Sequence, residues 1–555
     1  MEAYSTICPG CGLGCGLYLL RDSEKGEGGE RAATGKGMSI LHRKQSAVNA
    51  GKLCKFGMQL PHFYSRERLR TAVGGKNVSE EEAVKEARER LTTFRREEIA
   101  FLAMPSTVTN EEALAFLSLV SELECENFSL GFERFFSVAD FGILFRGMPL
   151  EEVERAEKVL LFFLDPFVQY PLLARRILRA KQRGARVVDV SFAENERAKG
   201  IYDETILAEE IVGDSVRDML SGGEDLGDVA SAVARALVGG GEKLENSLIL
   251  ADLNPLSPTD FISAAISLAE ETKSQILFLK PFLNANGANL LSAAMNMRGR
   301  DIFEILNDVK EGKIKCLFLL ETDLLYDGGG VDGTALENLE FLVVQDAFKS
   351  AISEFADITI CSEPLFLKKG TVVNVEGRVL SVGGVAQRTV EILERISGIE
   401  RTYKQVQEEV CKHLGISKLS EYESFVAPAS IASGKKSARK VANKEKKGVE
   451  AAETSEEGAR MDALTQLLWQ KTSPFFWHAW QTTRGTKRSE AIVEVSPSLA
   501  RRLNIFKGEM LEIRRRGESR RVAFRIAEIP SYLMISTDKI TKDGILVRVE
   551  VEKAK

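Results

Sequence analysis

The sequence predicts an α/β protein of several domains: a small cysteine-rich module, two doubly wound α/β domains and a barrel-like β domain. Three observations predict this architecture. The chain has 555 residues, enough for three or four domains at roughly 150 residues each. Short apolar runs alternate with helix-length amphipathic segments, which is typical of parallel sheets covered by helices. A charged, weakly apolar stretch at 426–460 then separates the last domain from the rest.

The boundaries between the predicted parts fall at Gly-rich or charged stretches. One is the run GGGE at 239–242. Residues 426–460 carry a basic block followed by an acidic one, which is typical of a disordered tether. The predicted parts are the cysteine-rich module at 1–70, α/β domains at 71–240 and 241–425, the tether at 426–460 and the β domain at 461–555.

Hydrophobic patterning predicts the elements inside these parts. Ser79 and Glu82 form a capping box that begins a helix reaching about Thr93. Buried strands are then predicted at Ile99–Met104, Lys158–Leu164, Ala185–Val190, Ser247–Ala251, Gln275–Leu279, Ile314–Leu320, Phe341–Gln345 and Asp357–Cys361. The β domain is predicted to contain strands at Ala491–Val495, Met510–Arg514 and Val522–Ile526 and a helix at Pro497–Leu503.

The composition excludes several classes of protein. Hydrophobic residues make up 44% of the chain and charged residues 28%, so disorder throughout is excluded. The net charge of −6 is too small and of the wrong sign for a dedicated nucleic-acid-binding protein. Apolar runs fall far below the ~20 residues that span a bilayer, and no export signal is recognisable. We therefore expect a cytoplasmic protein whose partners are proteins or small molecules.

Cysteine spacing is the most informative feature of the sequence. Cys8, Cys11 and Cys15 crowd into one Gly-rich loop, and Cys54 returns later between two glycines. In a reducing compartment, closely spaced thiols more often bind metal than form disulfides. Four thiolates at this spacing suit a [4Fe–4S] cluster, because each iron corner needs one sulfur and the loop must curl around a wide object. The alternatives are a Zn(Cys)4 site, which more usually takes two ligands from each of two loops, or unliganded cysteines.

The cysteine motif and several later blocks resemble a known family. CPGCGLGCGLYLL and the later GKLCKFG resemble the iron–sulfur module of molybdopterin oxidoreductases, especially the formate dehydrogenase α subunit and the related large iron–sulfur subunit of NADH dehydrogenase. Further family-like blocks follow in the expected order at Leu320–Leu325, Phe341–Phe348, Glu354–Ile360, Gly370–Arg378, Trp477–Ser489 and Val493–Arg502. The resemblance implies a bis-molybdopterin guanine dinucleotide with Mo or W between the domains, and a cluster that carries electrons away.

The resemblance also implies where the nucleoside ends of such a cofactor would bind. Its phosphates are expected at strand ends and helix N-termini of doubly wound sheets. Each candidate residue is equally able to cap a turn, form an ion pair or face solvent. The candidates are Asp165, Asp189, Asn374, Arg378, Thr483 and Arg484.

Three features near the expected pterin site depart from the family pattern. Active formate dehydrogenases place a Cys or selenocysteine metal ligand and a catalytic His after a TNEE-like motif, whereas here Phe135 and Phe136 fall at those places after Thr109–Glu112. Phe56 stands where a Lys between cluster and pterin is usual. The last domain, 461–555, resembles the family's molybdopterin dinucleotide-binding barrel but is expected to be a truncated form of it, shorter than the cofactor-closing domain of active members. All four cluster cysteines are nevertheless present.

These features predict an iron–sulfur subunit that carries electrons through one [4Fe–4S] cluster inside a larger redox complex, without metal–pterin catalysis of its own. Flavin or iron–sulfur proteins are its expected partners, and no catalytic residue is assigned. One alternative is an active molybdenum or tungsten bis-pterin enzyme such as formate dehydrogenase. The other is a zinc-stabilised structural subunit.

Overall fold

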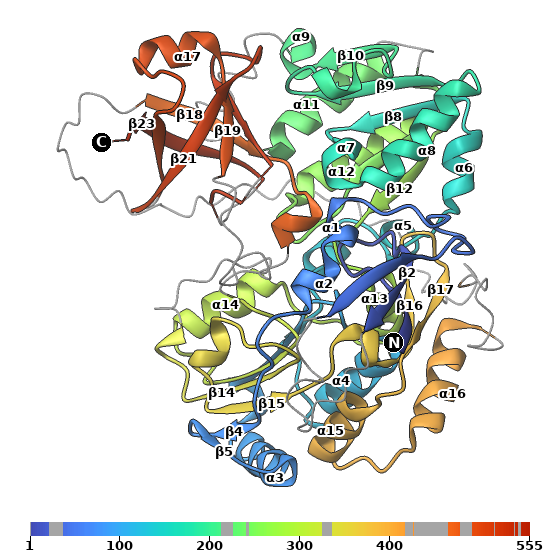
Figure 1. Cartoon of the computed structure of the whole chain (residues 1–555), viewed down its shortest axis with the longest axis vertical. Coiled ribbons are helices and arrows are strands. Elements are labelled where there is room, and N and C mark those ends of the chain that lie inside the picture. The colour runs from blue at the N-terminus through green and yellow to red at the C-terminus, as the bar shows by residue number, and fades with distance from the viewer. Residues whose placement is uncertain are drawn as a thin grey trace.

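The computed structural model describes residues 2–21, 37–212, 226–239, 244–324, 336–416, 426, 464–477, 491–515, 517–537, 539–541 and 545–554. Within these ranges the strands form sheets of three, five, seven and two strands and one closed barrel. Figure 1 shows the barrel beside the five-stranded layer and the seven-stranded layer at the opposite end of the molecule. The predicted fold class is confirmed.

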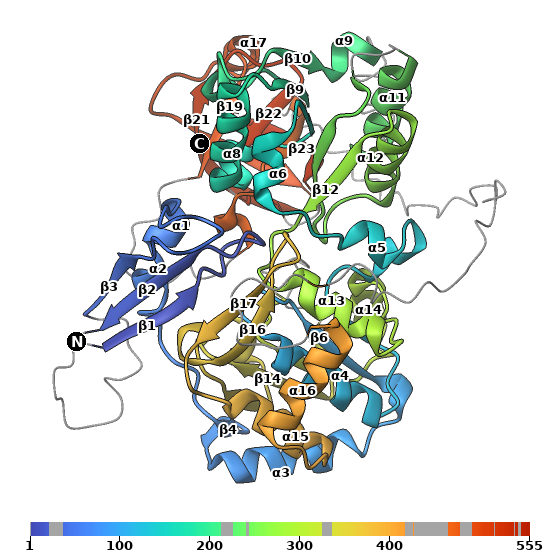
Figure 2. The same cartoon turned by 90° about the vertical axis from the view of Figure 1, so that its right-hand side faces the viewer.

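The N-terminal module is a small antiparallel sheet followed by two short helices. The register pairs Ile7 with Gly16, so the loop that carries the first three cysteines closes the first hairpin. Figure 2 shows the module projecting from one side of the molecule. Its elements are β1 (Glu2–Ile7), β2 (Gly16–Arg21), β3 (Met38–His42), α1 (Lys55–Met58) and α2 (Leu60–Phe63).

The five-stranded sheet is wholly parallel, with the order β10-β9-β8-β11-β12. Its strands are rich in Val, Ile and Leu, as expected for a sheet covered on both faces. They are β8 (Lys158–Phe162), β9 (Arg186–Ser191), β10 (Glu204–Leu207), β11 (Leu248–Asp252) and β12 (Gln275–Leu279). The helices of this part are α6 (Leu150–Arg155), α7 (Pro166–Gln169), α8 (Pro171–Gln182), α9 (Ala208–Val212), α11 (Leu226–Gly239) and α12 (Thr259–Glu271).

The seven-stranded sheet has the order β5-β4-β15-β14-β13-β6-β7 and is parallel from β15 to β7. Its strands are β4 (Ala72–Val73), β5 (Lys76–Asn77), β6 (Ile99–Ala103), β7 (Phe128–Ser129), β13 (Cys316–Leu320), β14 (Phe341–Asp346) and β15 (Ile358–Cys361). The helices of this part are α3 (Glu80–Leu91), α4 (Asn110–Glu122), α13 (Ala285–Ala294), α14 (Ile302–Lys310), α15 (Arg388–Ser397) and α16 (Tyr403–Leu414).

The division of the chain between these two sheets differs from the predicted boundary near 239–242. That boundary falls between β10 and β11, which are strands of the same five-stranded sheet. The seven-stranded sheet takes strands from both sides of it, since β6 and β7 precede the five-stranded sheet in sequence and β13 to β15 follow it. The reason is that hydrophobic patterning identifies buried strands but contains no information about which strands pair across a long separation.

The C-terminal domain is a closed six-stranded barrel with the order β18-β22-β19-β21-β20-β23. Its interior is filled by alternating apolar residues such as Val493, Val495 and Leu511. Residues 427–460 of the predicted tether lie outside the described residues. The barrel elements are β18 (Leu464–Gln470), β19 (Ile492–Val495), α17 (Pro497–Arg502), β20 (Met510–Arg515), β21 (Glu518–Ile526), β22 (Leu533–Ser536) and β23 (Leu546–Lys553).

A separate two-stranded hairpin, β16 (Lys369–Val373) with β17 (Val379–Gly383), lies against the N-terminal module. The approach is close, because a Cβ on Gly383 would lie 2.7 Å from the carbonyl oxygen of Ser5. The hairpin and the ends of the five-stranded sheet together hold the cysteine loop in place.

No helix in the described part of the chain is both long and apolar enough to cross a lipid bilayer.

Candidate functional site

The four N-terminal cysteines line one pocket. Cys8 follows β1, and its backbone N–H donates to the carbonyl oxygen of Cys15 at 2.8 Å, which closes the loop. Cys54 is the N-cap residue of α1. The structure therefore brings together every cysteine that the spacing predicts as a ligand. The remaining wall comes from Gly10, Leu13, Gly14, Phe56, Pro171, Leu172 and Pro474.

Glycine is required in this loop for two different reasons. Gly14 has φ +70, a left-handed conformation that favours glycine. Gly10 instead faces the Phe56 ring, where an added Cβ would lie 2.4 Å from a ring carbon. Phe56, at the position where the family usually has Lys, is buried beneath the cysteine loop and its ring centroid lies 4.8 Å from that of Phe63. This position supports the loop by packing.

Main-chain hydrogen bonds anchor the cysteine loop between two other parts of the chain. The Gly12 N–H donates to the carbonyl oxygen of Lys280, just after β12, at 2.8 Å. The Val375 N–H, in the β16–β17 turn, donates to the carbonyl oxygen of Gly12, also at 2.8 Å. The Asn374 amide donates to the carbonyl oxygen of Leu13 at 2.9 Å. The loop geometry is thus set by segments more than 250 residues away in sequence.

The cysteine thiols of the pocket are expected to be protonated when no metal is bound and to lose their protons when a metal cluster binds. Burial and the neighbouring Cys54 raise the pKa of Cys11 to about 12, and burial raises the pKa of Cys8 and Cys15 well above their ordinary value. Thiols bind metal only as thiolates, so binding must displace these protons. Among the described residues, no three Cys, His, Asp or Glu side chains are arranged to ligate a single metal ion.

Of the predicted cofactor contacts, Asp165 lies just beyond β8 at the carboxyl edge of the five-stranded sheet, whereas Asp189 lies inside β9. β8 has β9 on one side and β11 on the other, so this edge is a topological switch point, where ligands of doubly wound sheets bind. Asp165 caps α7 and its Oδ2 accepts a hydrogen bond from Lys471 at 2.8 Å. Asp189 is buried, and burial together with the charge of Asp165 raises its pKa well above the ordinary range.

Asp252, at the end of β11, completes this edge, although the sequence analysis did not single it out. Its carboxylate accepts hydrogen bonds from Tyr170, from Asn254 at 2.6 Å and from Thr472 at 3.2 Å. Burial raises its pKa to about 6. Lys471 and Thr472 follow β18, so the barrel supplies partners to both Asp165 and Asp252.

The other predicted cofactor contacts are distributed differently. Asn374 Oδ1 accepts the backbone N–H groups of Glu376 and Arg378 at 3.1 and 3.0 Å, and Arg378 pairs with Glu376 at 3.2 Å. Both residues therefore organise the β16–β17 turn on which the cysteine loop rests. Thr483 and Arg484 lie outside the described residues.

Phe135 and Phe136 belong to an aromatic cluster in the stretch that follows β7. Phe135 is fully buried, and the Phe136 ring centroid lies 4.1 Å from that of Phe141. Phe132 packs edge-on against Phe145, with ring centroids 5.8 Å apart, and against Phe282, with ring centroids 6.0 Å apart. Phe282 in turn packs against Trp477, which follows the first barrel strand, with ring centroids 5.6 Å apart. A series of packed aromatic rings therefore connects the stretch after β7 with the C-terminal barrel domain.

Comparison with known proteins identifies the first part of the chain. Residues 1–65 match the family model described as the molybdopterin oxidoreductase Fe4S4 domain. Residues 1–65 are therefore similar to a molybdopterin oxidoreductase Fe4S4 domain. The match covers the cysteine loop, Cys54 and both short helices, so the pocket lies within the Fe4S4 domain apart from Pro171, Leu172 and Pro474.

Outside the Fe4S4 domain the likeness is more distant. The chain is 24% identical over 471 residues to the F420-dependent formate dehydrogenase subunit alpha of Methanocaldococcus jannaschii, covering 70% of this chain and 68% of that protein. It is 26% identical over 290 residues to the NADPH-Fe(3+) oxidoreductase subunit alpha of Geobacter sulfurreducens, covering 49% of this chain and 33% of that protein. The structure superposes on acetylene hydratase from Pelobacter acetylenicus with a TM-score of 0.64 at 11% identity, over 96% of this chain and 92% of that one. The whole architecture is therefore a molybdopterin enzyme fold.

A second pocket lies where the Fe4S4 domain meets the carboxyl edge of the seven-stranded sheet. It is bordered by Tyr64 and Arg66 and by the acidic residues Glu321, Asp323 and Asp346. The edge between β6 and β13 is again a topological switch point. Burial and the charge of Glu321 raise the pKa of Asp346 to about 7. The pocket is thus acidic, with one guanidinium at its border.

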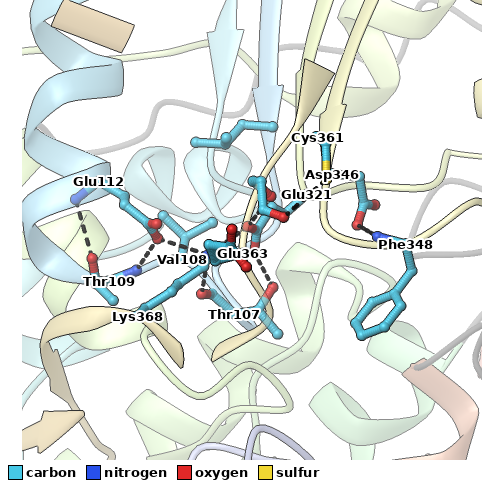
Figure 3. Close-up of polar contacts among 12 residues, drawn as sticks. Thr107, Val108, Thr109, Glu112, Glu321, Asp346, Phe348, Cys361, Glu363 and Lys368 are labelled. Carbon is cyan, nitrogen blue, oxygen red and sulfur yellow. Dashed lines mark hydrogen bonds and ion pairs between the residues drawn. The ribbon is translucent and has the colours of Figure 1, made fainter. Parts of the chain in front are cut away.

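Beside this pocket, a buried lysine joins three distant segments, as Figure 3 shows. Lys368 donates to Glu112 Oε2 and to the carbonyl oxygen of Thr107, both at 3.0 Å, and it contacts Glu321. Burial alone disfavours the ammonium, yet Glu112 and Glu321 outweigh it and raise the pKa of Lys368. Glu112 also completes the capping box of α4 with Thr109, so the TNEE motif positions the ion pair as well as the helix.

Lys280 is a further residue that no sequence signal identified. It is fully buried, its Nζ donates to the carbonyl oxygen of Phe278 at 2.9 Å, and it lies 5.2 Å from the Phe145 ring centroid. Burial lowers the pKa of Lys280 to about 7, although the charge of Asp252 opposes this shift. A lone Lys after an apolar strand has no distinctive spacing, so only the tertiary structure places it between the cysteine loop and the aromatic cluster.

Proposed function

We propose that this chain is an iron–sulfur subunit that carries electrons through one [4Fe–4S] cluster inside a larger redox complex, without metal–pterin catalysis of its own. The observation that carries the proposal is the convergence of Cys8, Cys11, Cys15 and Cys54 on one pocket inside an Fe4S4 domain. The residues fit the cluster in number, ligand chemistry and spacing. A [4Fe–4S] centre passes one electron at a time and needs no acid–base residue beside it.

The residues in the stretch after β7 do not fit the metal-binding role that the family resemblance implies there. An aromatic ring has no lone pair to offer a transition metal and no proton to exchange, and both Phe135 and Phe136 are packed against other rings. Asp165 and Asp252 already accept hydrogen bonds from Lys471 and Thr472. These contacts support a structural role for the region that surrounds a pterin in active relatives.

The expected setting follows from the same reasoning. An electron-carrying cluster needs a second redox centre nearby, so we propose that flavin or iron–sulfur subunits assemble with this chain in the cytoplasm. The relatives from Methanocaldococcus jannaschii and Geobacter sulfurreducens are both named as alpha subunits, which supports a multisubunit setting.

A second candidate function is an active molybdenum or tungsten enzyme such as a formate dehydrogenase. The observation that favours it is the 70% of this chain that aligns with a formate dehydrogenase alpha subunit, together with polar carboxyl edges at both switch points. The residues that would hold the nucleoside ends are then those at the two edges, and the bound metal would supply the oxidation–reduction chemistry. The third candidate function is that of a structural subunit in which the four cysteines bind zinc.

Metal and cofactor analysis of the anaerobically purified chain separates these functions. Under the first proposal we expect about four irons with matching sulfide, a reduced-cluster EPR signal after dithionite, little molybdenum or tungsten, and no guanine nucleotide in a denatured extract. Stoichiometric molybdenum or tungsten with guanine nucleotide, and formate-dependent dye reduction, would instead establish the second. One zinc in a colourless preparation would establish the third.

A further inference from the structure

The segment that leaves the first barrel strand runs back toward the centre of the molecule. Residues 471–477 follow β18 and end in a short helical turn, Pro474–Trp477. In the views of Figure 1 and Figure 2, this orange-red segment reaches from the barrel toward the blue N-terminal module. We call residues 471–477 the strap. The strap links the barrel to the region around the four cysteines.

The beginning of the strap is held at the carboxyl edge of the five-stranded sheet. Lys471 Nζ donates to Asp165 Oδ2 at 2.8 Å. The Thr472 hydroxyl accepts a hydrogen bond from the Gln169 amide at 2.8 Å and donates to Asp252 Oδ2 at 3.2 Å. All five side chains are buried, and hydrogen bonds that involve charged groups are strong where water is excluded. We call these three contacts the latch.

The middle of the strap forms part of the wall of the cysteine pocket. Pro474 is buried and lines this pocket together with Pro171 and Leu172, which begin α8. All three side chains are apolar, so this wall does not solvate a charge in the pocket. The hydrophobic surroundings of a metal site control both solvent access and reduction potential. The strap is therefore placed to affect both properties of a bound cluster.

The end of the strap is anchored beside the cysteine loop. Phe476 and Trp477 are both buried, and the Trp477 ring centroid lies 5.6 Å from that of Phe282. The carbonyl oxygen of Phe282 lies 3.4 Å from the place that a Cβ on Gly12 would occupy. Phe282 thus contacts the cysteine loop with its main chain and the strap with its ring. Pro474 lies between the polar latch on one side and this aromatic contact on the other.

We propose that the strap is the lid of the cysteine pocket. The latch at the sheet edge holds Pro474 against the pocket, and loosening the latch admits water and small oxidants. The inference rests on the proposed function, because it takes the four cysteines to bind a [4Fe–4S] cluster, and it adds the segment that controls access to this cluster. An apolar lid disfavours the reduced cluster, which is the more negatively charged state, so opening the lid should raise the reduction potential.

Two variants open the lid at different points. Pro474→Gly removes a ring from the pocket wall, and Thr472→Val removes the hydroxyl of the latch while keeping the shape of the side chain. The matched control is Pro497→Gly, which changes the first residue of α17 in the same barrel and does not line the cysteine pocket. Circular dichroism of each purified variant verifies that the chain is folded.

The first measurement follows the cluster in each anaerobically loaded chain. After mixing with air-saturated buffer, absorbance near 400 nm should decay severalfold faster in Pro474→Gly and Thr472→Val than in the wild type. The midpoint potential from an EPR-monitored redox titration should be higher in both variants. The control Pro497→Gly should match the wild type in both measurements.

The second measurement tests the lid without any iron. Iodoacetamide should alkylate the four pocket cysteines of the cluster-free chain severalfold faster in Pro474→Gly than in the wild type, as read by peptide mass spectrometry. Cys125 is buried elsewhere in the same chain and should react equally slowly in both.

The outcomes separate this proposal from the proposed function. A wild-type chain that binds no iron, with faster alkylation in Pro474→Gly, would overturn the relay function and support the lid. If iron is bound but both variants decay and alkylate at the wild-type rate, the lid proposal is wrong. Faster proteolysis between the barrel and the rest in both variants would also overturn it, because the whole barrel would then be the cover.

Discussion

Lys471 and Asp165 form a buried ion pair across 306 residues of chain, with Nζ and Oδ2 2.8 Å apart. Asp165 lies at the carboxyl edge of the five-stranded sheet and Lys471 follows the first barrel strand. Figure 1 shows the barrel beside this sheet. The pair joins the two domains at the switch point where a doubly wound sheet ordinarily binds its ligand, so the region has a structural role irrespective of any cofactor.

Removing Lys471 should therefore destabilise the docked barrel. Lys471→Met leaves Asp165 buried without its cation and close to the buried Asp189, which costs about 3 kcal/mol or more. We expect a lower urea midpoint and faster proteolysis between the barrel and the rest. The double variant Lys471→Met/Asp165→Asn should recover most of the loss, because no unpaired charge then remains. If the single variant unfolds like the wild type, the pair contributes nothing to docking.

Cys11→Ser should abolish the cluster without unfolding the α/β domains. The larger cluster of buried apolar side chains spans both large sheets and includes no residue of the cysteine module, whereas an iron–sulfur cluster that lacks one thiolate loses a corner ligand. Iron content and absorbance near 400 nm should fall severalfold, while far-ultraviolet circular dichroism stays unchanged. Cys125→Ser serves as the control, since Cys125 is buried at β6 and its Sγ lies 3.3 Å from the carbonyl oxygen of Ile99. Loss of the entire fold in Cys11→Ser would indicate a purely structural metal.

Gly12→Ala should displace the cysteine loop from its support. A Cβ at Gly12 would lie 2.6 Å from both the carbonyl oxygen of Lys280 and a methyl carbon of Val375. Neither atom can yield easily, because Lys280 and Val375 also bond the Gly12 backbone. We expect iron incorporation to fall by more than half. The control is Gly57→Ala, where the nearest atom, 3.2 Å away, is the end of the flexible Leu53 side chain; equal iron content in the two variants would contradict the clash.

Glu133 should make the free energy of unfolding depend on pH. Burial raises its pKa to about 7 despite hydrogen bonds from Ser129 and the Leu130 N–H. A carboxyl whose folded-state pKa is raised stabilises the fold fully below its unfolded pKa, and that stability is lost as pH rises through the folded pKa. Between pH 5 and 7 the loss approaches about 1.4 kcal/mol per pH unit. Glu133→Gln should flatten urea unfolding curves measured across this range, and the exposed Glu337→Gln should not.

Local patterns in the sequence predicted most elements accurately. The predicted strand at Gln275–Leu279 matches β12 residue for residue, and Phe341–Gln345 differs from β14 by one. Ser79 caps α3 by accepting a hydrogen bond from the Glu82 N–H at 3.1 Å, which is one of the two hydrogen bonds of the predicted capping box. Such features depend on hydrogen bonds and burial within a few residues, so a single segment contains the information.

Pairing over long distances was not predictable in the same way. Each of the two large sheets is built from strands far apart in sequence. Lys280 and Asn374 form hydrogen bonds with the distant cysteine loop. Lys368 likewise contacts Glu112 and Glu321, which come from two other segments. A lone Lys or Asn has no periodicity and no spacing to a partner that would reveal these roles.

The amino-acid sequence by itself determined the ligand chemistry of this protein, because four cysteines on Gly-rich loops are a local property of the chain. Only the tertiary structure decided what surrounds those ligands, with Phe56 packed against Gly10 and the carbonyl oxygen of Lys280 bonded to Gly12. The physical reason is that thiolate chemistry depends on residue type, whereas support, electrostatics and access depend on which distant segments fold against the same few atoms.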